Sequence, residues 1–260
     1  PNTTAGITVN RLCGSGLAAT LDAARGVKVG EGDLFLSGGV ESMSRAPIVM
    51  SKAHLAFDRG QTIADSTLGA RFTNPAYSNM FGDDTMPQTA DNIARDLGIS
   101  REESDVFAAG SQSKYEAARA DGFFSGEIIP IEVPQGRKKP PRVVDADEHP
   151  RPASSLETLS GLRSLFDGGV VTAGNASGIN DGAAALIIGN RAVGEKYGVK
   201  PRARIIAGGV AGVEPRVMGL GPVFAIKKAL ARANLNLSDM DIIEINEAFA
   251  AQSIAVLKTL

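Results

Sequence analysis

The sequence has 260 residues, of which 43% are hydrophobic and 22% charged, and its formal net charge at pH 7 is −2. This balance offers no basic field to nucleic acid or an anionic membrane surface, and no apolar run approaches the roughly 20 residues that a membrane helix needs. One cysteine and two histidines argue against a disulfide framework and a metal centre. We therefore expect a globular protein with no nucleic-acid partner, no membrane segment and no bound metal.

The first quarter of the sequence has the pattern of an α/β core. A short β-branched run at residues 7–9 predicts a strand, and the Ala- and Leu-rich residues 17–25 predict a helix that ends at Gly26. Residues 34–36 predict a second, buried strand. Strands that alternate with helices are typical of α/β folds.

From about residue 43 to residue 175, Pro, Gly, Asn and Asp interrupt the chain so often that we predict a loop-rich insertion with a few helices. One helix should begin at Ser100, because Glu103 stands three residues later in the capping-box spacing. A second should carry Leu156, Leu159 and Leu162, which recur at helical spacing.

The residue pattern of a buried α/β core returns in the last third of the chain. The continuous apolar run 183–188 predicts a strand that is buried on both faces. A helix over 222–233, a strand over 242–245 and a terminal helix follow. The chain starts at a proline and stops inside an apolar helix, so we expect both ends to be truncated.

Cys13 is the first candidate for chemistry. It falls where a strand should end and a helix begin, and there unpaired N–H groups and the positive end of the helix dipole favour the thiolate. Gly14 and Gly16 leave room beside the sulfur for a bulky acyl group. A lone cysteine is often only a small buried side chain, but its flanking residues favour a functional role.

Two further segments have both a structural and a functional interpretation. The small-residue loop 173–182 could hold an extended ligand against backbone amides, or simply form a tight turn before the next strand. Asn246, after the predicted strand 242–245, could position a water or stabilise an oxyanion, or could cap the last helix with Glu247 in its first turn. The pattern does not decide between these.

The other polar candidates carry less weight. His149 could act as a base for Cys13, but its proline-rich surroundings favour a surface-loop or loop-anchoring role, and His54 receives no role. The basic run 137–139 is interpreted as a solvated loop, with contact to an anionic cofactor tail as the alternative.

Six blocks of the sequence, spread across essentially the whole chain, resemble the thiolase family in the family's order. They are VNRLCGSGLAA, SGGVESMSRAP, DEHPRP, VTAGNASGINDGAAAL, AGVEPRVMGLGP and NEAFAAQ. The resemblance implies two similar α/β halves packed into a five-layered α-β-α-β-α core, with an inserted loop domain. It divides the chain into a partial N-terminal core (1–45 and 178–200), a loop domain (46–177) and the start of a C-terminal core (201–260), so that the fold is incomplete at both ends.

The resemblance also implies coenzyme A chemistry, with CoA as a substrate and no permanently bound cofactor. Cys13 matches the nucleophile that takes the acyl group as a thioester, and Asn246 matches the residue that holds a catalytic water in an oxyanion hole. The remaining matches bind the substrate: Ser177, Ala176 and Gly178 beside the pantetheine arm, and Met86, Met218 and Phe249 in the apolar lining of the acyl and pantetheine pocket. Family members are usually homodimers or homotetramers, and we expect a cytoplasmic location.

Two of the family's blocks do not occur in these residues. They are a Gly-His-Pro block, whose histidine activates the nucleophile, and a Cys-x-Gly-Gly-Gly block, which supplies the acid–base cysteine. We therefore expect the 260-residue chain by itself to be a poor catalyst or inactive.

The stretch 47–91 resembles the branch that cleaves 3-oxoadipyl-CoA in aromatic-compound catabolism, the β-ketoadipate pathway. Thr85 stands where the short-chain biosynthetic branch tends to carry histidine, and Arg59 and Arg71 are candidates to pair with the far carboxylate of the substrate. The alternatives are a general fatty acyl thiolase of β-oxidation or an acetoacetyl-CoA thiolase, and a non-catalytic acyl-CoA-binding module. A cysteine hydrolase of another fold would need His54 or His149 as its base.

Overall fold

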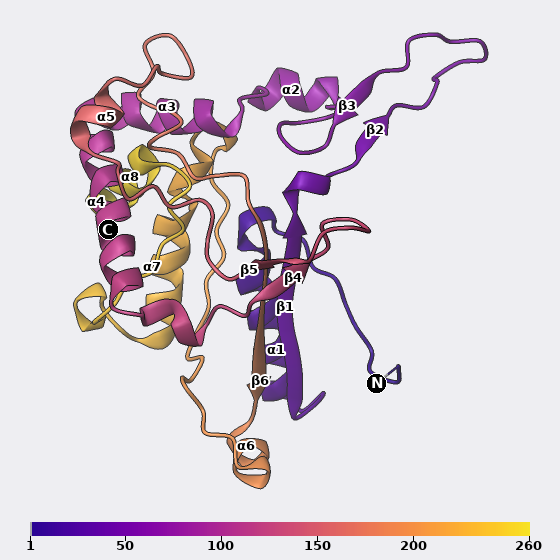
Figure 1. Ribbon diagram of the computed structural model, residues 1–260, viewed down its shortest axis with the longest axis vertical. Coiled ribbons are helices and arrows are strands. Elements are labelled where there is room, and N and C mark those ends of the chain that lie inside the picture. Colours follow the sequence, from indigo (N-terminus) through magenta and orange to yellow (C-terminus); the bar gives the residue numbers. More distant parts are fainter. Residues whose placement is uncertain (1) are drawn as a thin grey trace. The chain divides into compact units, whose positions relative to one another are not determined.

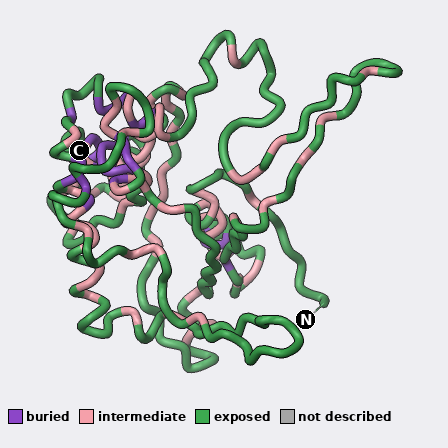
Figure 2. The backbone as a smooth tube through the Cα atoms, turned by 45° about the horizontal axis from the view of Figure 1, so that its top comes forward, coloured by how far each residue is buried: buried purple, intermediate pink, exposed green. Residues whose placement is uncertain are grey.

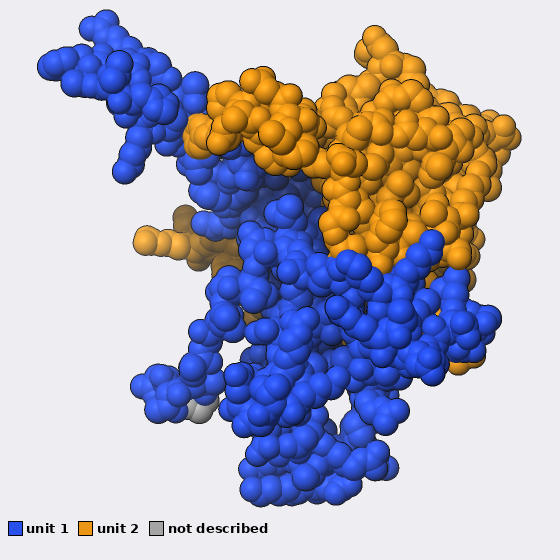
Figure 3. Space-filling model, turned by 180° about the vertical axis from the view of Figure 1, so that it is seen from behind, with its two compact units in different colours: residues 1–71, 179–210, 225–239 blue, residues 72–178, 211–224, 240–260 orange. Residues whose placement is uncertain are grey.

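The structure is a computed structural model that describes residues 2–260. The chain divides into two compact units, coloured separately in Figure 3. The first unit comprises residues 1–71, 179–210 and 225–239, and the second comprises residues 72–178, 211–224 and 240–260.

The first unit is built around an antiparallel strand pair. Its elements are α1 (Ser15–Val29), β1 (Leu34–Ser42), β2 (Ile48–Met50), β3 (Ile63–Asp65), β6 (Asp181–Gly189) and α6 (Arg191–Tyr197), with 3₁₀ helices at Leu12–Gly14, Met43–Arg45 and Leu237–Asp239. β1 pairs with β6 along its whole length, and β2 pairs with β3 (Figure 1). The helix α7 (Gly221–Ala233) contributes residues to both units.

The helix α1 packs closely on β1, which explains why its predicted end was wrong. Gly26 lies inside α1, and a Cβ on this residue would be 2.8 Å from Cζ of Phe35. Gly26 is therefore a close-approach residue between helix and strand, and the helix continues to Val29, where Gly30 ends it with a φ of +78°. Thr20 and Ser37 add a hydrogen bond of 3.1 Å between the same two elements.

The apolar run 183–188 does form a strand, β6, but the prediction that it is buried on both faces was wrong. Leu186 and Ile187 are 55% and 69% exposed. A continuous apolar run indicates full burial only where further elements cover both faces. Within residues 2–260 the helix that packs on this pair is α1, and the side chains that it covers include Phe35 and Ser37.

Two other predicted strands were also wrong. Residues 7–9 and 242–245 have no regular secondary structure and belong to no sheet within the described chain. β-Branched residues favour an extended backbone, yet a strand forms only where a neighbouring segment takes up its hydrogen bonds.

The second unit is mainly helical. Its elements are α2 (Pro75–Phe81), α3 (Met86–Leu97), α4 (Arg101–Ala120), β4 (Ile131–Val133), β5 (Arg142–Val144), α5 (Leu156–Ser160) and α8 (Ala250–Thr259), with 3₁₀ helices at Phe123–Gly126 and Pro215–Leu220. The predicted capping box at the start of α4 is confirmed: Ser100 Oγ accepts from the amide of Glu103, and the Glu103 carboxylate accepts from the amide of Ser100. The predicted third leucine of α5, Leu162, lies beyond the end of that helix.

The core of the second unit lies around α8, which packs against α3 and α4. Ala251 and Ala255 of α8 pack with Ile93 and Ala94 of α3, and Ala250 packs with Ala108 of α4. Figure 2 shows the largest group of buried residues along these helices. Small residues on α8 allow its neighbours to approach closely, so this helix fixes the relative positions of α3 and α4.

Within residues 2–260, every helix is either too short or not apolar enough to cross a membrane.

Candidate active site

Two segments that are distant in the sequence pair side by side in the second unit. Ser177 donates its amide hydrogen to the carbonyl oxygen of Ala248 at 2.9 Å, and Ala250 donates to the carbonyl oxygen of Asn175, also at 2.9 Å. Between them, Ala176 forms an antiparallel bridge with Phe249. The small-residue loop and the segment that enters α8 therefore form one local structure.

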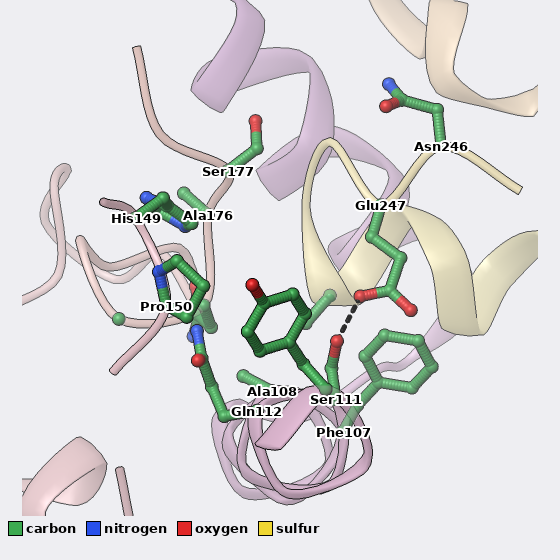
Figure 4. A pocket seen from close by; sticks show the side chains of 14 residues that line it. Phe107, Ala108, Ser111, Gln112, His149, Pro150, Ala176, Ser177, Asn246 and Glu247 are labelled. Atoms are coloured by element: carbon green, nitrogen blue, oxygen red, sulfur yellow. Dashed lines mark hydrogen bonds between the residues drawn. The ribbon is translucent and has the colours of Figure 1, made fainter. Parts of the chain in front are cut away.

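A pocket of about 280 Å³ lies beside this paired structure (Figure 4). Gly174 to Ser177 form part of its wall, Asn246 and Glu247 form another part, and His149 and Pro150 contribute from a third segment. All of these residues belong to the second unit. Gly174, Ala176 and Ser177 have small side chains, so the backbone forms much of this part of the wall.

One face of α4 holds the segments that surround the pocket. Ser111 donates a hydrogen bond of 2.6 Å to the carboxylate of Glu247. The side chain of the next residue, Gln112, accepts from the amide of Arg151, and one turn after Ser111 the Tyr115 hydroxyl donates to Asp147 at 3.0 Å. Tyr115 is four residues after Ser111 and three after Gln112, so it shares a side of the helix with each of them. This side of α4 supports the pocket wall.

Tyr115 is the pocket residue with a shifted protonation equilibrium. Burial raises the pKa of Tyr115 above its ordinary value, and the hydrogen bond and negative charge of Asp147 act in the same direction. A raised pKa keeps the phenol neutral at physiological pH. Tyr115 therefore serves as a hydrogen-bond donor in the wall of the pocket.

Asn246 and Glu247 point in opposite directions. In Figure 4 the Glu247 carboxylate turns toward Ser111, whereas the Asn246 side chain extends away from that contact. The first residue before α8 is Phe249, so the interpretation of Asn246 as the helix cap was wrong. The side chain of Asn246 is left free for another role.

Cys13 lies in the first unit, in the 3₁₀ helix immediately before α1, and is exposed. The predicted position at the start of a helix is therefore confirmed. Ser15 Oγ accepts from the amide of Arg11 at 2.8 Å and donates to the carbonyl of Leu12 at 2.7 Å, which closes a tight turn around the cysteine. Leu12 has a φ of +47°, a conformation that residues with a Cβ rarely adopt and that is often found at functional sites.

The other residues expected in the pocket lie in the second unit but do not line this pocket. Met86 begins α3 and is 40% exposed, and Met218 lies in the 3₁₀ helix Pro215–Leu220 and is 37% exposed. The Phe249 side chain is buried and packs with Ala90 and Val171. The backbone of Phe249 pairs with Ala176, which does line the pocket, and Gly178 follows Ser177 at the end of the same loop.

His149 lines the pocket with Ala176 and Ser177, as do α4 residues such as Tyr115 that the sequence did not single out. The surface-loop or loop-anchoring role favoured for His149 did not place it in this pocket. Arg151 donates through Nη1 to the carbonyls of Glu148, His149 and Pro150, and so fixes the backbone that carries this histidine. The available signal was the DEHPRP block itself, because a histidine beside proline has a constrained backbone.

The basic residues of the loops are exposed. Arg59 and Arg71 belong to the first unit, and Arg71 donates to the carbonyl of Gly69. The basic run 137–139 lies in the turn between β4 and β5.

Two family models match successive parts of the chain. The model described as "Thiolase, N-terminal domain" matches residues 1–192, and "Thiolase, C-terminal domain" matches residues 199–260.

Curated relatives and solved structures agree with these matches. The chain is 55% identical to the beta-ketoadipyl-CoA thiolase of Acinetobacter baylyi, over 97% of this chain and 63% of that protein. It is 53% identical to the 3-oxoadipyl-CoA/3-oxo-5,6-dehydrosuberyl-CoA thiolase of Escherichia coli, over 100% of this chain and 65% of that protein. The crystal structure of human mitochondrial 3-ketoacyl-CoA thiolase in complex with CoA superposes with a TM-score of 0.89 at 40% identity, over 100% of this chain and 64% of that one. The chain thus spans somewhat less than two thirds of the length of the proteins it matches.

Proposed function

This chain belongs to the thiolase family and has its fold, and from that premise we propose that the full-length protein cleaves 3-oxoadipyl-CoA by thiolysis. By full-length protein we mean these 260 residues with any sequence that the gene adds on either side. The names of the two bacterial relatives, each more than 50% identical, support this choice of substrate. We also propose that the chain divides into a partial N-terminal core, a loop domain and the start of a C-terminal core.

In the proposed reaction, the thiolate of Cys13 attacks the ketone carbon C3 of the substrate, and the bond between C2 and C3 breaks. The carbanion that leaves is protonated and departs as acetyl-CoA, while a succinyl group stays on Cys13 as a thioester. The thiolate of a second CoA then attacks this thioester, which releases succinyl-CoA and returns the cysteine. The covalent intermediate divides one difficult step into two easier ones.

The pocket of the second unit is proposed to hold the pantetheine arm. The observation that carries this assignment is the pairing of residues 175–177 with residues 248–250, which places Ser177, Ala176 and Asn246 around one pocket. We assign Ser177, Ala176 and Gly178 to pantetheine contacts. We assign Asn246 to holding the water of an oxyanion hole, because a fixed donor stabilises an oxyanion better than solvent that must reorient. Met86, Met218 and Phe249 stay proposed as apolar contacts of the substrate.

The proton transfers are assigned by family resemblance to a histidine and a second cysteine in blocks that residues 1–260 do not contain. We therefore expect the 260-residue chain by itself to be inactive. For the full-length protein, we propose a cytoplasmic homodimer or homotetramer. Acyl-CoA and CoA are its proposed partners.

The test is a substrate panel with purified full-length protein and CoA. We expect the highest kcat/KM for 3-oxoadipyl-CoA, formation of acetyl-CoA and succinyl-CoA in equal amounts, and no turnover by the Cys13→Ala variant. A preference for acetoacetyl-CoA or for long-chain 3-oxoacyl-CoAs would replace the substrate but keep the reaction. Tight binding of acyl-CoA without any cleavage would identify a binding module and overturn the proposed reaction.

A further inference from the structure

We propose that Asp105 is a positioning residue that holds the loop carrying Ala176 and Ser177 in the geometry needed to bind pantetheine. It acts through its hydrogen bond to Asn175, the residue that precedes them. This inference rests on the proposed function, because it assigns a role in binding the CoA substrate.

Asn175 has every polar atom of its side chain in use. Its Nδ2 donates to Oδ1 of Asp105 at 2.9 Å and to the carbonyl of Val170 at 2.9 Å, and its Oδ1 accepts from the amide of Thr172 at 2.8 Å. Asn175 is only 5% exposed and Thr172 is fully buried. Because three partners in different directions bind one planar amide, the side chain has a single satisfied orientation.

The other end of this contact is a buried carboxylate. Asp105 is 1% exposed, and its second oxygen, Oδ2, accepts from Nε of Arg101 at 2.7 Å. Arg101 in turn donates through Nη2 to the carbonyls of Leu159 and Leu162. A buried charge that is paired on one side and hydrogen-bonded on the other is held strongly, and removing either partner leaves the remaining group unsatisfied.

The network reaches both parts of the pocket wall. The backbone carbonyl of Asn175 accepts from the amide of Ala250, and the next residue, Ala176, pairs with Phe249. Asn175, Ala176 and Ser177 all line the pocket. A shift of Asn175 therefore moves the surface that the ligand would touch, and small displacements of this kind lower binding and rate without unfolding the protein.

A positioning role and a merely structural role predict different results. If Asp105 only stabilised the fold, its loss would lower activity toward every substrate by the same factor. If it positions the pantetheine-binding loop, the loss should be concentrated in substrates that carry pantetheine. The readout is therefore a ratio: kcat/KM for 3-oxoadipyl-CoA divided by kcat/KM for the S-methyl thioester of the same acid, which has no pantetheine arm.

The experiment compares wild-type full-length protein with Asp105→Asn, which keeps the size of the side chain but removes its charge and one acceptor. We expect the ratio to fall by about tenfold, the effect of losing one hydrogen bond to a charged group. The matched control is Glu116→Gln, which removes a carboxylate paired with Arg119 on the same helix but far more exposed; its ratio should equal that of the wild type. An equal loss toward both substrates, or no loss, would overturn the positioning role.

A second variant decides the matter if Asp105→Asn does not fold. Asn175→Asp would place two carboxyl groups within hydrogen-bond distance, near Arg101, so that the pair would retain a proton. At each pH, the ratio of the variant is divided by the wild-type ratio, because His149 and Glu247 line the same pocket. We expect this quotient to recover as the pH falls from about 8 to about 6. A pH-independent quotient would count against the inference. A wild-type protein that cleaves no CoA thioester would instead overturn the proposed function itself, and this inference with it.

Discussion

The amide of Ser177 and the carbonyl of Ala248 are joined by a hydrogen bond of 2.9 Å. Through this bond, a loop that precedes β6 and the segment that precedes α8 become one wall of a pocket. The two segments of the proposed CoA site therefore depend on each other, and a substitution that displaces one should also displace the other.

Ala176 should tolerate no large side chain. It is half-buried, lines the pocket and packs against the cluster that contains Phe249. In full-length protein, Ala176→Leu should lower kcat/KM for CoA substrates by at least about tenfold because the added atoms occupy the proposed pantetheine site. Steady-state kinetics measures this.

The control for this prediction is Ala117→Leu, at an exposed position of α4, which should keep wild-type kinetics. Alkylation of Cys13 by iodoacetamide should proceed at the wild-type rate in both variants. Unchanged CoA kinetics in Ala176→Leu would show that the pocket does not receive the substrate.

Gly174 should be required for close packing of the loop. A Cβ at this residue would be 2.5 Å from Cδ2 of Leu159 and 2.5 Å from Cδ1 of Leu162. Gly174→Ala should therefore lower the free energy of unfolding by about 1–3 kcal/mol. Urea denaturation of the purified protein measures it.

Gly110 provides the opposite case on α4, because a Cβ there would meet no atom within 4 Å. Gly110→Ala should raise the free energy of unfolding by about 0.5–1 kcal/mol, since alanine loses less conformational entropy in a helix. Equal stabilities of the two variants would contradict this account of the loop packing.

The contact between Glu103 and Lys258 should make stability depend on pH in the acid range. The hydrogen bond from Lys258, followed by that from the amide of Ser100, lowers the pKa of Glu103 below its ordinary value of 4.5. Its contribution is therefore fully present above pH 4.5 and is lost as the pH falls through the folded-state pKa. Because the side chains of Lys258 and Glu103 are 50% and 43% exposed, the effect should be small.

Glu103→Gln keeps the capping box but cannot be titrated, so its melting temperature should fall less than that of the wild type between pH 4.5 and pH 3. Lys258→Gln should give an intermediate fall, because Glu103 then still titrates and keeps the hydrogen bond from the Ser100 amide. Melting curves that run parallel in all three proteins would show that this contact does not contribute.

The exposed arginines Arg59 and Arg71 should separate dicarboxylic from other substrates. If one of them pairs with the far carboxylate, its replacement by glutamine in full-length protein should lower kcat/KM for 3-oxoadipyl-CoA by about tenfold or more and leave acetoacetyl-CoA almost unchanged. Arg137→Gln, in the turn between β4 and β5, is the control. Equal losses toward both substrates would refute the assignment.

Local signals in the sequence were sufficient for several elements. The start of α4 was predicted from Ser100 and Glu103, whose capping interactions need no other part of the protein. The position of Cys13 directly before α1 also followed from local residues. The order of six sequence blocks predicted the family, since each block combines several residue types at fixed spacing.

Features that depend on distant partners were not predicted. Residues 7–9 and 242–245 have the composition of strands, but they pair with no strand of residues 2–260. The pocket position of His149 depends on the contact between Gln112 of α4 and the amide of Arg151, which joins segments that are distant in the sequence. The contact between Asp105 and Asn175 likewise joins residues that no short motif connects.

The most direct test of the central claim is mass spectrometry of the peptide that contains Cys13. Full-length protein is mixed with 3-oxoadipyl-CoA in the absence of free CoA, quenched in acid and digested. We predict a succinyl group on Cys13 and an equal amount of released acetyl-CoA, with the label removed when CoA is added. Release of acetyl-CoA without any acyl group on Cys13, or an acyl group on another residue, would contradict the account.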